Sequence, residues 1–226
     1  LPKGTTIFNT LSNYMRSVLF PAGYVEVKAP IVFNKALWER SGHWDHYREN
    51  MFLVESENEQ MGLKAMNCPG HMLIFGSEVR SYRDLPIRFH EQTALHRNEA
   101  SGTLSGLTRV RQFAQDDAHC FVMESQIGEE VERLLKLITR VYDDFVAALT
   151  EQAKATGCGM PDEDVLFGPV NNPNQLARVS GFFDRLPKHA EVNAGGARQG
   201  DKGFFFSPTV VSGLKQNDEM VQTEIF

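Results

Sequence analysis

Two long segments with the pattern of extended strands, separated by a polar loop, constrain the fold of this chain most strongly. Residues 87–96 and 110–122 have the length and composition of extended strands, and serine and glycine residues punctuate the segment between them. Two strands joined by one loop predict a hairpin whose arms project side chains over one face of a sheet. Charged and aromatic side chains lie in or beside the loop and could form a ligand-binding surface, although the pattern taken alone is more typical of exposed salt bridges: Arg97, Glu99, Arg109 and Phe113.

Helices and shorter strands flank this hairpin. The spacing of apolar residues predicts helices at 5–20, 34–42, 69–77 and 124–155. Alternating patterns predict shorter strands at 24–28, 51–55 and 61–66. The predicted fold class is therefore α+β, an antiparallel sheet with flanking helices. Beyond Gly157, a helix at 175–186 and an extended segment at 203–211 predict a small mixed α/β unit.

Composition narrows the functional classes. With 226 residues, of which 42% are hydrophobic, the chain can bury one sizeable core or two small ones. The formal net charge of −6 argues against a nucleic-acid-binding module that fills the chain, although a local basic stripe is enough for contact with RNA. No apolar run is long enough to span a membrane, and the N-terminus has no signal-peptide layout. Few, unclustered cysteines predict a cytoplasmic location, and a first residue other than Met predicts a fragment or processed chain.

Two short segments carry groups that can bind ligands. Residues 66–71, Met-Asn-Cys-Pro-Gly-His, hold a cysteine in a tight turn, and residues 115–119, Gln-Asp-Asp-Ala-His, hold a histidine beside two carboxylates. A separated cysteine and histidine are more often a core residue and a hydrogen-bonded histidine than metal ligands. Likewise, an Arg-x-Glu tripeptide such as 97–99 is more often an exposed salt bridge. Cys120 and Cys158 are predicted to be small buried hydrophobic residues.

Three segments, 66–71, 96–113 and 115–119, resemble the catalytic core of the threonyl-tRNA synthetase family in their order and spacing. This family belongs to the class II aminoacyl-tRNA synthetases. The resemblance covers about residues 1–145. It implies a ligase that activates threonine with ATP to threonyl-adenylate and then charges tRNA, with Mg²⁺ offsetting phosphate charge. It also implies a homodimer formed through the first class motif, a helix and strand that end at Pro30.

The resemblance implies an ATP site in the hairpin. Arg97 would be the catalytic residue that clamps the α-phosphate, and Phe113 would stack on adenine. Glu99 and Arg109 would complete the ATP-binding set.

The resemblance also implies a zinc-dependent threonine site. Cys68 and His119 would bind Zn²⁺, and coordination by the substrate hydroxyl would distinguish threonine from valine. The implied contacts to threonine are Met66, Gln115 and Asp117. His71 is predicted to be a helix-capping or core residue.

Two features of the family have no match in this sequence. The third class motif, with its arginine for the γ-phosphate, is not found. The third zinc ligand of the family is a downstream histidine, but His189 lies in a segment that does not match. The predicted ligase core is therefore incomplete in this chain.

From about residue 150 onward, several segments resemble the catalytic domain of the aldehyde dehydrogenases: 164–170, 192–196, 203–210 and 219–226. Glu224 would match a glutamate that contacts the nicotinamide ribose of NAD. The nucleophilic cysteine segment is absent, so no dehydrogenase activity is predicted. The chain is predicted to join two pieces, 1–145 and 146–226, at a junction between Val141 and Thr156. Two alternatives stay open: an inactive truncated or chimeric domain that binds nucleotide or dimerises, and an NAD-binding aldehyde dehydrogenase fragment.

Overall fold

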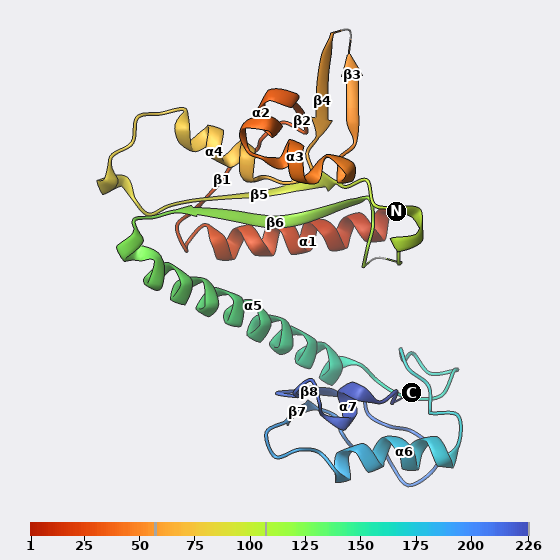
Figure 1. Ribbon diagram of the computed structural model, residues 1–226. Coiled ribbons are helices and arrows are strands. Elements are labelled where there is room, and N and C mark those ends of the chain that lie inside the picture. The colour runs from red at the N-terminus through yellow and green to blue at the C-terminus, as the bar shows by residue number, and fades with distance from the viewer. Residues whose placement is uncertain (57, 107, 226) are drawn as a thin grey trace. The chain divides into compact units, whose positions relative to one another are not determined.

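The computed structural model describes residues 1–56, 58–106 and 108–225 (Figure 1). The chain divides into two compact units, Leu1–Glu130 and Val131–Phe226. Parts of three predicted segments lie outside the described residues: Glu57 in the turn between the strands predicted at 51–55 and 61–66, Leu107 in the hairpin loop and Phe226 at the C-terminus.

The first unit is built on a three-stranded sheet with the strand order β1-β5-β6. β1 (Tyr24–Glu26) pairs in parallel with β5 (Ile87–His96), and β5 pairs antiparallel with β6 (Gln112–Phe121) from end to end. The predicted hairpin is therefore confirmed. The helix α1 (Pro2–Leu19) runs along one face of this sheet (Figure 1), where the side chain of Gln92 donates to the backbone oxygen of Ser12 at 3.2 Å.

A second sheet has the order β2-β4-β3 and is antiparallel throughout. Its strands are β2 (Val32–Asn34), β3 (Leu53–Ser56) and β4 (Glu59–Leu63), and the short helices around it are α2 (Lys35–Arg40), α3 (His43–Tyr47) and η1 (Arg48–Asn50). Trp38 is fully buried and packs edge-on against Phe33 with 5.7 Å between ring centroids. The other buried members of this core are Ala29, Trp44, Met51 and Ala65. β2 and α3 were not predicted, because three and five residues are too few to show a periodic pattern.

The helix α4 (Cys68–Gly76) covers the face of the first sheet opposite α1 (Figure 1). It begins at Cys68 and carries Pro69 in its first turn, where the missing backbone N–H costs nothing. A Cβ added to Gly70 would lie 2.9 Å from the Cβ of Ala29. Glycine at this position therefore allows α4 to approach the segment that follows β1.

Short 3-10 turns complete the first unit: η2 (Tyr82–Asp84), η3 (Ser101–Thr103) in the hairpin loop and η4 (Glu124–Gln126).

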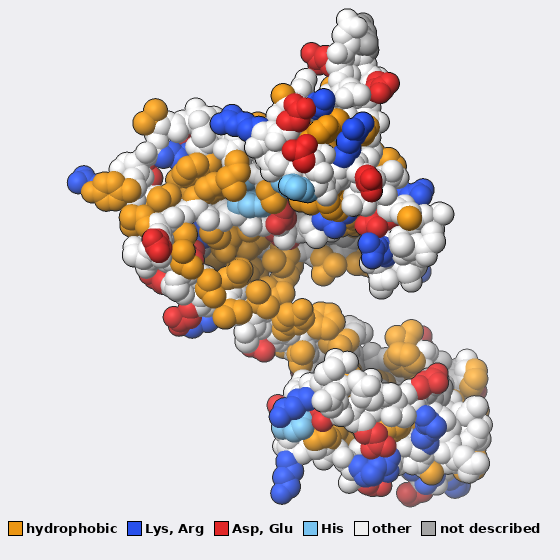
Figure 2. All heavy atoms as spheres, in the orientation of Figure 1, with side chains coloured by type: hydrophobic (Ala, Val, Ile, Leu, Met, Phe, Trp, Pro, Cys, Tyr) orange, Lys and Arg blue, Asp and Glu red, His pale blue; other side chains and the backbone are white. Residues whose placement is uncertain are grey.

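The long helix α5 (Ile127–Ala155) starts in this unit, where the Nε of Arg88 donates to a carboxylate oxygen of Glu130 at 2.6 Å. Many apolar side chains of α5 are exposed (Figure 2): Ile127, Val131, Leu134, Leu135, Ile138, Tyr142, Phe145 and Leu149.

The second unit is small and mixed, as predicted. It contains α6 (Pro173–Asp184), the two-stranded antiparallel sheet of β7 (Glu191–Ala194) and β8 (Val210–Ser212), and α7 (Glu219–Gln222). Its buried apolar residues are Cys158, Val179, Phe182, Ala194 and Val210. Within the described parts of the chain, no helix is long and apolar enough to cross a membrane.

The two cysteines predicted to be buried differ in environment. Cys158 is buried as predicted, but Cys120 is exposed, so that prediction was wrong. Cys120 lies on β6 at the edge of the sheet, directly across from Arg88. Alternate residues of β6 share the face of Cys120, and its neighbours there, Asp116 and Ala118, are also exposed, so this face of the strand is left uncovered.

Candidate functional site

One face of the β5–β6 pair carries several of the residues predicted to bind ATP, threonine or a metal ion. The register pairs Glu91 with Asp117, and Leu95 with Phe113. Since alternate residues of a strand point to the same face, four residues of β6 share the face covered by α4. They are Phe113, Gln115, Asp117 and His119.

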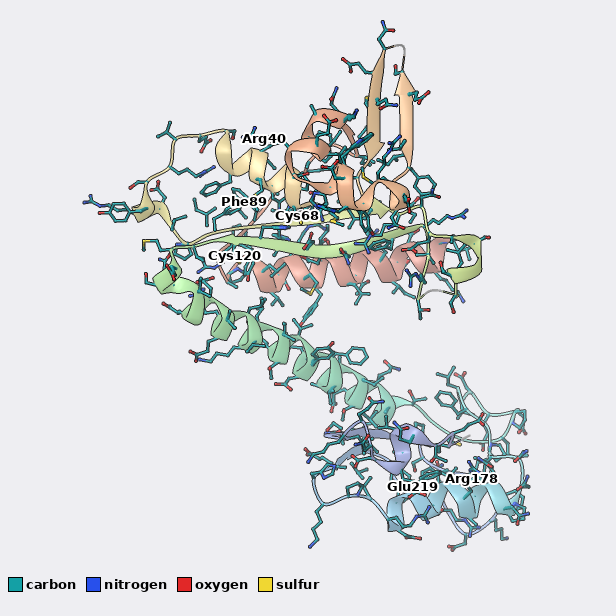
Figure 3. The ribbon with its side chains drawn as sticks, in the orientation of Figure 1. Arg40, Cys68, Phe89, Cys120, Arg178 and Glu219 are labelled. Atoms are coloured by element: carbon teal, nitrogen blue, oxygen red, sulfur yellow. The ribbon has the colours of Figure 1, made fainter. Side chains whose placement is uncertain are left out.

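A hydrogen bond ties the cysteine turn to this face. Asn67, directly before α4, is fully buried, and its side-chain amide donates to Asp117 at 3.0 Å. Cys68 follows at the start of α4 (Figure 3). Burial, and then the negative charge of Asp117, raise the pKa of the Cys68 thiol above its ordinary value. Without a nearby cation, Cys68 is therefore held in the protonated form.

His71 lies beneath the same face and is fully buried. Its Nδ1 is 2.9 Å from the Nδ1 of His119, and its Nε2 is 3.3 Å from a carboxylate oxygen of Glu91. The other oxygen of Glu91 accepts from the ammonium of Lys64 at 2.8 Å and from the backbone N–H of Ala29 at 2.9 Å. Burial, and then the neighbouring His119 ring, lower the pKa of His71.

The prediction that His71 is a core residue is thus confirmed by its burial, but the sequence reasoning missed its contact with His119. A signal was present in the spacing. His71 follows Cys68 by three positions on a helix, and residues three apart lie on neighbouring parts of the helix surface.

Arg97 and Phe113 also come together. The guanidinium carbon of Arg97 lies 4.9 Å from the centroid of the Phe113 ring and 6.0 Å from that of Tyr47. The Nε of Arg97 donates a long hydrogen bond, 3.4 Å, to the backbone oxygen of Ala65. The side chain that was predicted to clamp a phosphate is therefore held against the ring that was predicted to stack on a base.

The two remaining loop candidates form a separate pair. Arg109 donates to one carboxylate oxygen of Glu99 through two nitrogens, at 3.0 and 3.1 Å. Glu99 therefore pairs across the hairpin loop with Arg109. Of the other candidates, Met66 is partly buried against the tryptophan core, and Gln115 is exposed. Glu224 is exposed in the second unit, just after α7.

The predicted metal ligands do not make a complete metal site. Among residues 1–56, 58–106 and 108–225, no group of three or more His, Cys, Asp and Glu side chains is arranged to hold a metal ion. Cys68 and His119 are suitable donors for zinc, but a catalytic zinc normally has three protein ligands.

Comparison with known proteins defines the class of this chain. The model of the "tRNA synthetase class II core domain (G, H, P, S and T)" matches residues 52–203, and the chain belongs to this family. The threonine–tRNA ligase of Myxococcus xanthus (strain DK1622) is 60% identical over 144 residues, which cover 62% of this chain and 22% of that protein. The corresponding ligase of Ehrlichia chaffeensis (strain ATCC CRL-10679 / Arkansas) is 56% identical over 143 residues, covering 63% of this chain and 23% of that protein. The chain thus spans less than a quarter of these relatives.

Solved structures agree with this class. The RNA-binding domain of threonyl-tRNA synthetase from Cryptosporidium parvum Iowa II superimposes with a TM-score of 0.58 at 40% identity, covering 77% of this chain and 41% of that one. Giardia lamblia prolyl-tRNA synthetase in complex with prolyl-adenylate gives a TM-score of 0.58 at 22% identity, covering 64% of this chain and 30% of that one, and shows the shared fold alone.

These comparisons confirm the predicted α+β fold and the resemblance to threonyl-tRNA synthetase cores. They lend no support to the aldehyde dehydrogenase resemblance. The family match extends to residue 203, well into the segment for which that resemblance was predicted. No comparison tests the predicted division of the chain between residues 145 and 146 or its predicted chimeric origin, so both stay predictions.

Proposed function

We propose that this chain is part of the catalytic core of a threonine–tRNA ligase, which joins ATP and threonine as threonyl-adenylate and then charges tRNA. The observation that carries the proposal is the 60% identity over 144 residues with a threonine–tRNA ligase. The contact between Arg97 and Phe113 supports it, because a cation and a flat apolar ring lie together on the predicted nucleotide face.

In this proposal, Arg97 is the catalytic residue, because it contacts the α-phosphate at which the reaction occurs. Its guanidinium would offset charge that grows on the phosphate as threonine attacks. Phe113 would offer adenine the ring face that Arg97 does not occupy. Glu99 and Arg109 would close the same site as an ion pair, and Mg²⁺ would bind the phosphate oxygens.

The threonine site would lie further along the same strand. We assign its contacts to Met66, Gln115 and Asp117, with Cys68 and His119 as two ligands of Zn²⁺. Since the described residues supply only these two ligands, no step of the reaction is assigned to the metal.

The test of this proposal is ATP binding followed by exchange of labelled pyrophosphate into ATP. We expect ATP binding; because two features of the family have no match in this chain, exchange should be slow, and any exchange should depend on threonine and be weaker with valine. Replacing Arg97 by alanine should weaken ATP binding by about tenfold to a hundredfold, because a hydrogen bond to a charged group is worth about 1.5–3 kcal/mol. Arg40→Ala is the control, since Arg40 is an exposed arginine at the end of α2 (Figure 3).

The competing hypotheses predict other results. Binding of ATP without threonine-dependent exchange indicates a nucleotide-binding domain that is inactive by itself. Binding of NAD in preference to ATP indicates the dehydrogenase fragment. Equal ATP affinity of the parent chain and Arg97→Ala would refute the role of Arg97.

We also propose a cytoplasmic homodimer that forms through α1, β1 and the segment ending at Pro30. Exposed apolar residues of α1 support such an interface: Ile7, Phe8 and Leu11. Sedimentation equilibrium of the parent chain and of Leu11→Glu tests it, and a monomer at micromolar concentration would contradict the proposal.

A further inference from the structure

Asn67 occupies the N-cap position of α4, but its side chain does not cap the helix. An asparagine at this position normally accepts a hydrogen bond from a backbone N–H of the first turn, which stabilises the helix. The same chain shows that arrangement twice. Before α2, Asn34 accepts from the backbone N–H of Ala36 at 2.9 Å. Before α6, Asn172 accepts from the backbone N–H of Gln175 at 2.8 Å.

The side chain of Asn67 is held instead by Asp117, which lies 50 positions further along the chain on β6. The Nδ2 of Asn67 donates to the Oδ2 of Asp117 at 3.0 Å; Asn67 is fully buried and Asp117 is half-buried. Since an ionised carboxylate only accepts hydrogen bonds, the amide must present its NH₂ group to Asp117. The amide oxygen, Oδ1, is then buried with no hydrogen-bonding partner among the described residues.

This orientation of Asn67 costs stability at two points. The first turn of α4 lacks the cap that its own asparagine could supply, and a buried oxygen lacks a donor. Both costs would be smaller if the side chain turned to cap the helix. Natural proteins break such local rules mainly at functional sites. The contact with Asp117 therefore serves something other than the stability of α4.

The turn that carries Asn67 is firmly held. The backbone N–H of Lys64 donates to the backbone oxygen of Ile31 at 2.7 Å, and the oxygen of Lys64 accepts from the N–H of His96 at 2.8 Å. Lys64, Ala65 and Asn67 are all fully buried. A side chain on such a fixed base can orient the group to which it donates, because its own rotamer is locked by packing.

We propose that Asn67 is a positioning residue for recognition of the threonine hydroxyl. Its amide holds the Oδ2 of Asp117, so that the Oδ1 of the same carboxylate stays in place to accept from that hydroxyl. This inference rests on the proposed function, in which Asp117 contacts threonine. Valine has a methyl group instead of the hydroxyl and would leave the oriented carboxylate without a donor. A carboxylate free to rotate could turn toward solvent and would distinguish the two amino acids less well.

The test compares the affinity of the whole chain for two stable analogues of an aminoacyl-adenylate, threonyl-sulfamoyl-adenosine and valyl-sulfamoyl-adenosine, by isothermal titration calorimetry. The parent chain should prefer the threonyl analogue by about tenfold to a hundredfold, as expected for one hydrogen bond to a charged group. Asn67→Ala should lose most of this preference through weaker binding of the threonyl analogue. A change that merely loosened the site would weaken both analogues alike and leave their ratio unchanged.

Two further variants separate orientation from folding. In Asn67→Ser the hydroxyl can cap α4 but is too short to reach Asp117, so this variant should be at least as stable in urea as Asn67→Ala and should lose the same preference. When Asp117→Ala is already present, adding Asn67→Ala should not change the ratio further, because no carboxylate remains to be held. Asn34→Ala is the matched control: it removes the cap of α2 and should lower stability without changing the ratio.

Each outcome decides a different point. The inference is overturned if Asn67→Ala or Asn67→Ser keeps the preference of the parent chain. It is also overturned if Asn67→Ala lowers the ratio equally with and without Asp117, since Asn67 would then act independently of that carboxylate. If the parent chain binds the two analogues equally, or binds neither, the proposed threonine site fails and this inference fails with it.

Discussion

Replacing Lys64 by methionine should destabilise the first unit by about 3–5 kcal/mol, the range found when one partner of a buried ion pair is removed. The Lys64 ammonium is fully buried, 2.8 Å from a carboxylate oxygen of Glu91, which is 1% exposed. Methionine has a similar length and no charge, so it fills the space without replacing the interaction. Glu91 would keep its hydrogen bonds to His71 and Ala29 but lose its cationic partner.

The size of the effect comes from two large opposing terms. At 2.8 Å and an effective dielectric constant of about 20, the attraction between the two charges is about 6 kcal/mol. Removing each ion from water costs several kcal/mol, so the intact pair contributes little net stability. The variant Lys64→Met/Glu91→Gln removes both charges and keeps an acceptor oxygen for His71. We expect it to be at least about 2 kcal/mol more stable than Lys64→Met alone.

Urea denaturation followed by tryptophan fluorescence measures this difference. Both tryptophans of the chain, Trp38 and Trp44, are buried in the first unit, so their emission reports on that unit separately from the second. The free energy of unfolding comes from the transition midpoint and slope.

The exposed pair between Lys35 and Glu39 is the matched control. The Nζ of Lys35 lies 3.1 Å from a carboxylate oxygen of Glu39, and the two side chains are 35% and 50% exposed. Lys35→Met should therefore cost no more than about 1 kcal/mol of stability. The reasoning is refuted if Lys64→Met costs no more than Lys35→Met. It is also refuted if adding Glu91→Gln to Lys64→Met lowers stability further.

Three more outcomes are expected. Gly70→Ala should lower the free energy of unfolding by about 1–3 kcal/mol in the same urea assay, because the added Cβ would overlap that of Ala29. Gly76→Ala in the same helix is the control: its added Cβ would meet no atom within 4 Å, so this variant should be neutral or stabilising. Burial raises the pKa of Tyr24 from 10.0 to about 12, so between these values the folded state keeps a proton that the unfolded state loses. The contribution of Tyr24 to the free energy of unfolding is therefore complete below pH 10 and is lost as the pH rises toward 12. Tyr24→Phe should flatten the pH dependence of stability over that range. Cys68→Ala should abolish zinc binding measured by plasma mass spectrometry, while Cys120→Ala should leave it unchanged; equal zinc in both variants would remove Cys68 from the metal site.

Much of the first unit follows from local pattern. The strand predicted at 87–96 has those bounds in the structure, because Pro86 precedes it and a loop containing serine and glycine follows it. Alternation along the second arm places Asp117 and His119 on one face without any knowledge of the tertiary structure. Very short elements such as β2 and α3 escaped prediction because their conformation depends on packing around Trp38 and Trp44.

The sequence by itself therefore determined the hairpin, the residue types it presents and the family to which they belong. Only the tertiary structure decided how those residues are held. Glu91 and Lys64 are charged residues that a sequence pattern would leave at the surface, yet they are buried together across 27 positions of chain. His71 meets His119 across 48 positions. Such contacts arise from the way α4 packs on β5 and β6, and neither periodicity nor local propensity encodes which distant side chains will meet.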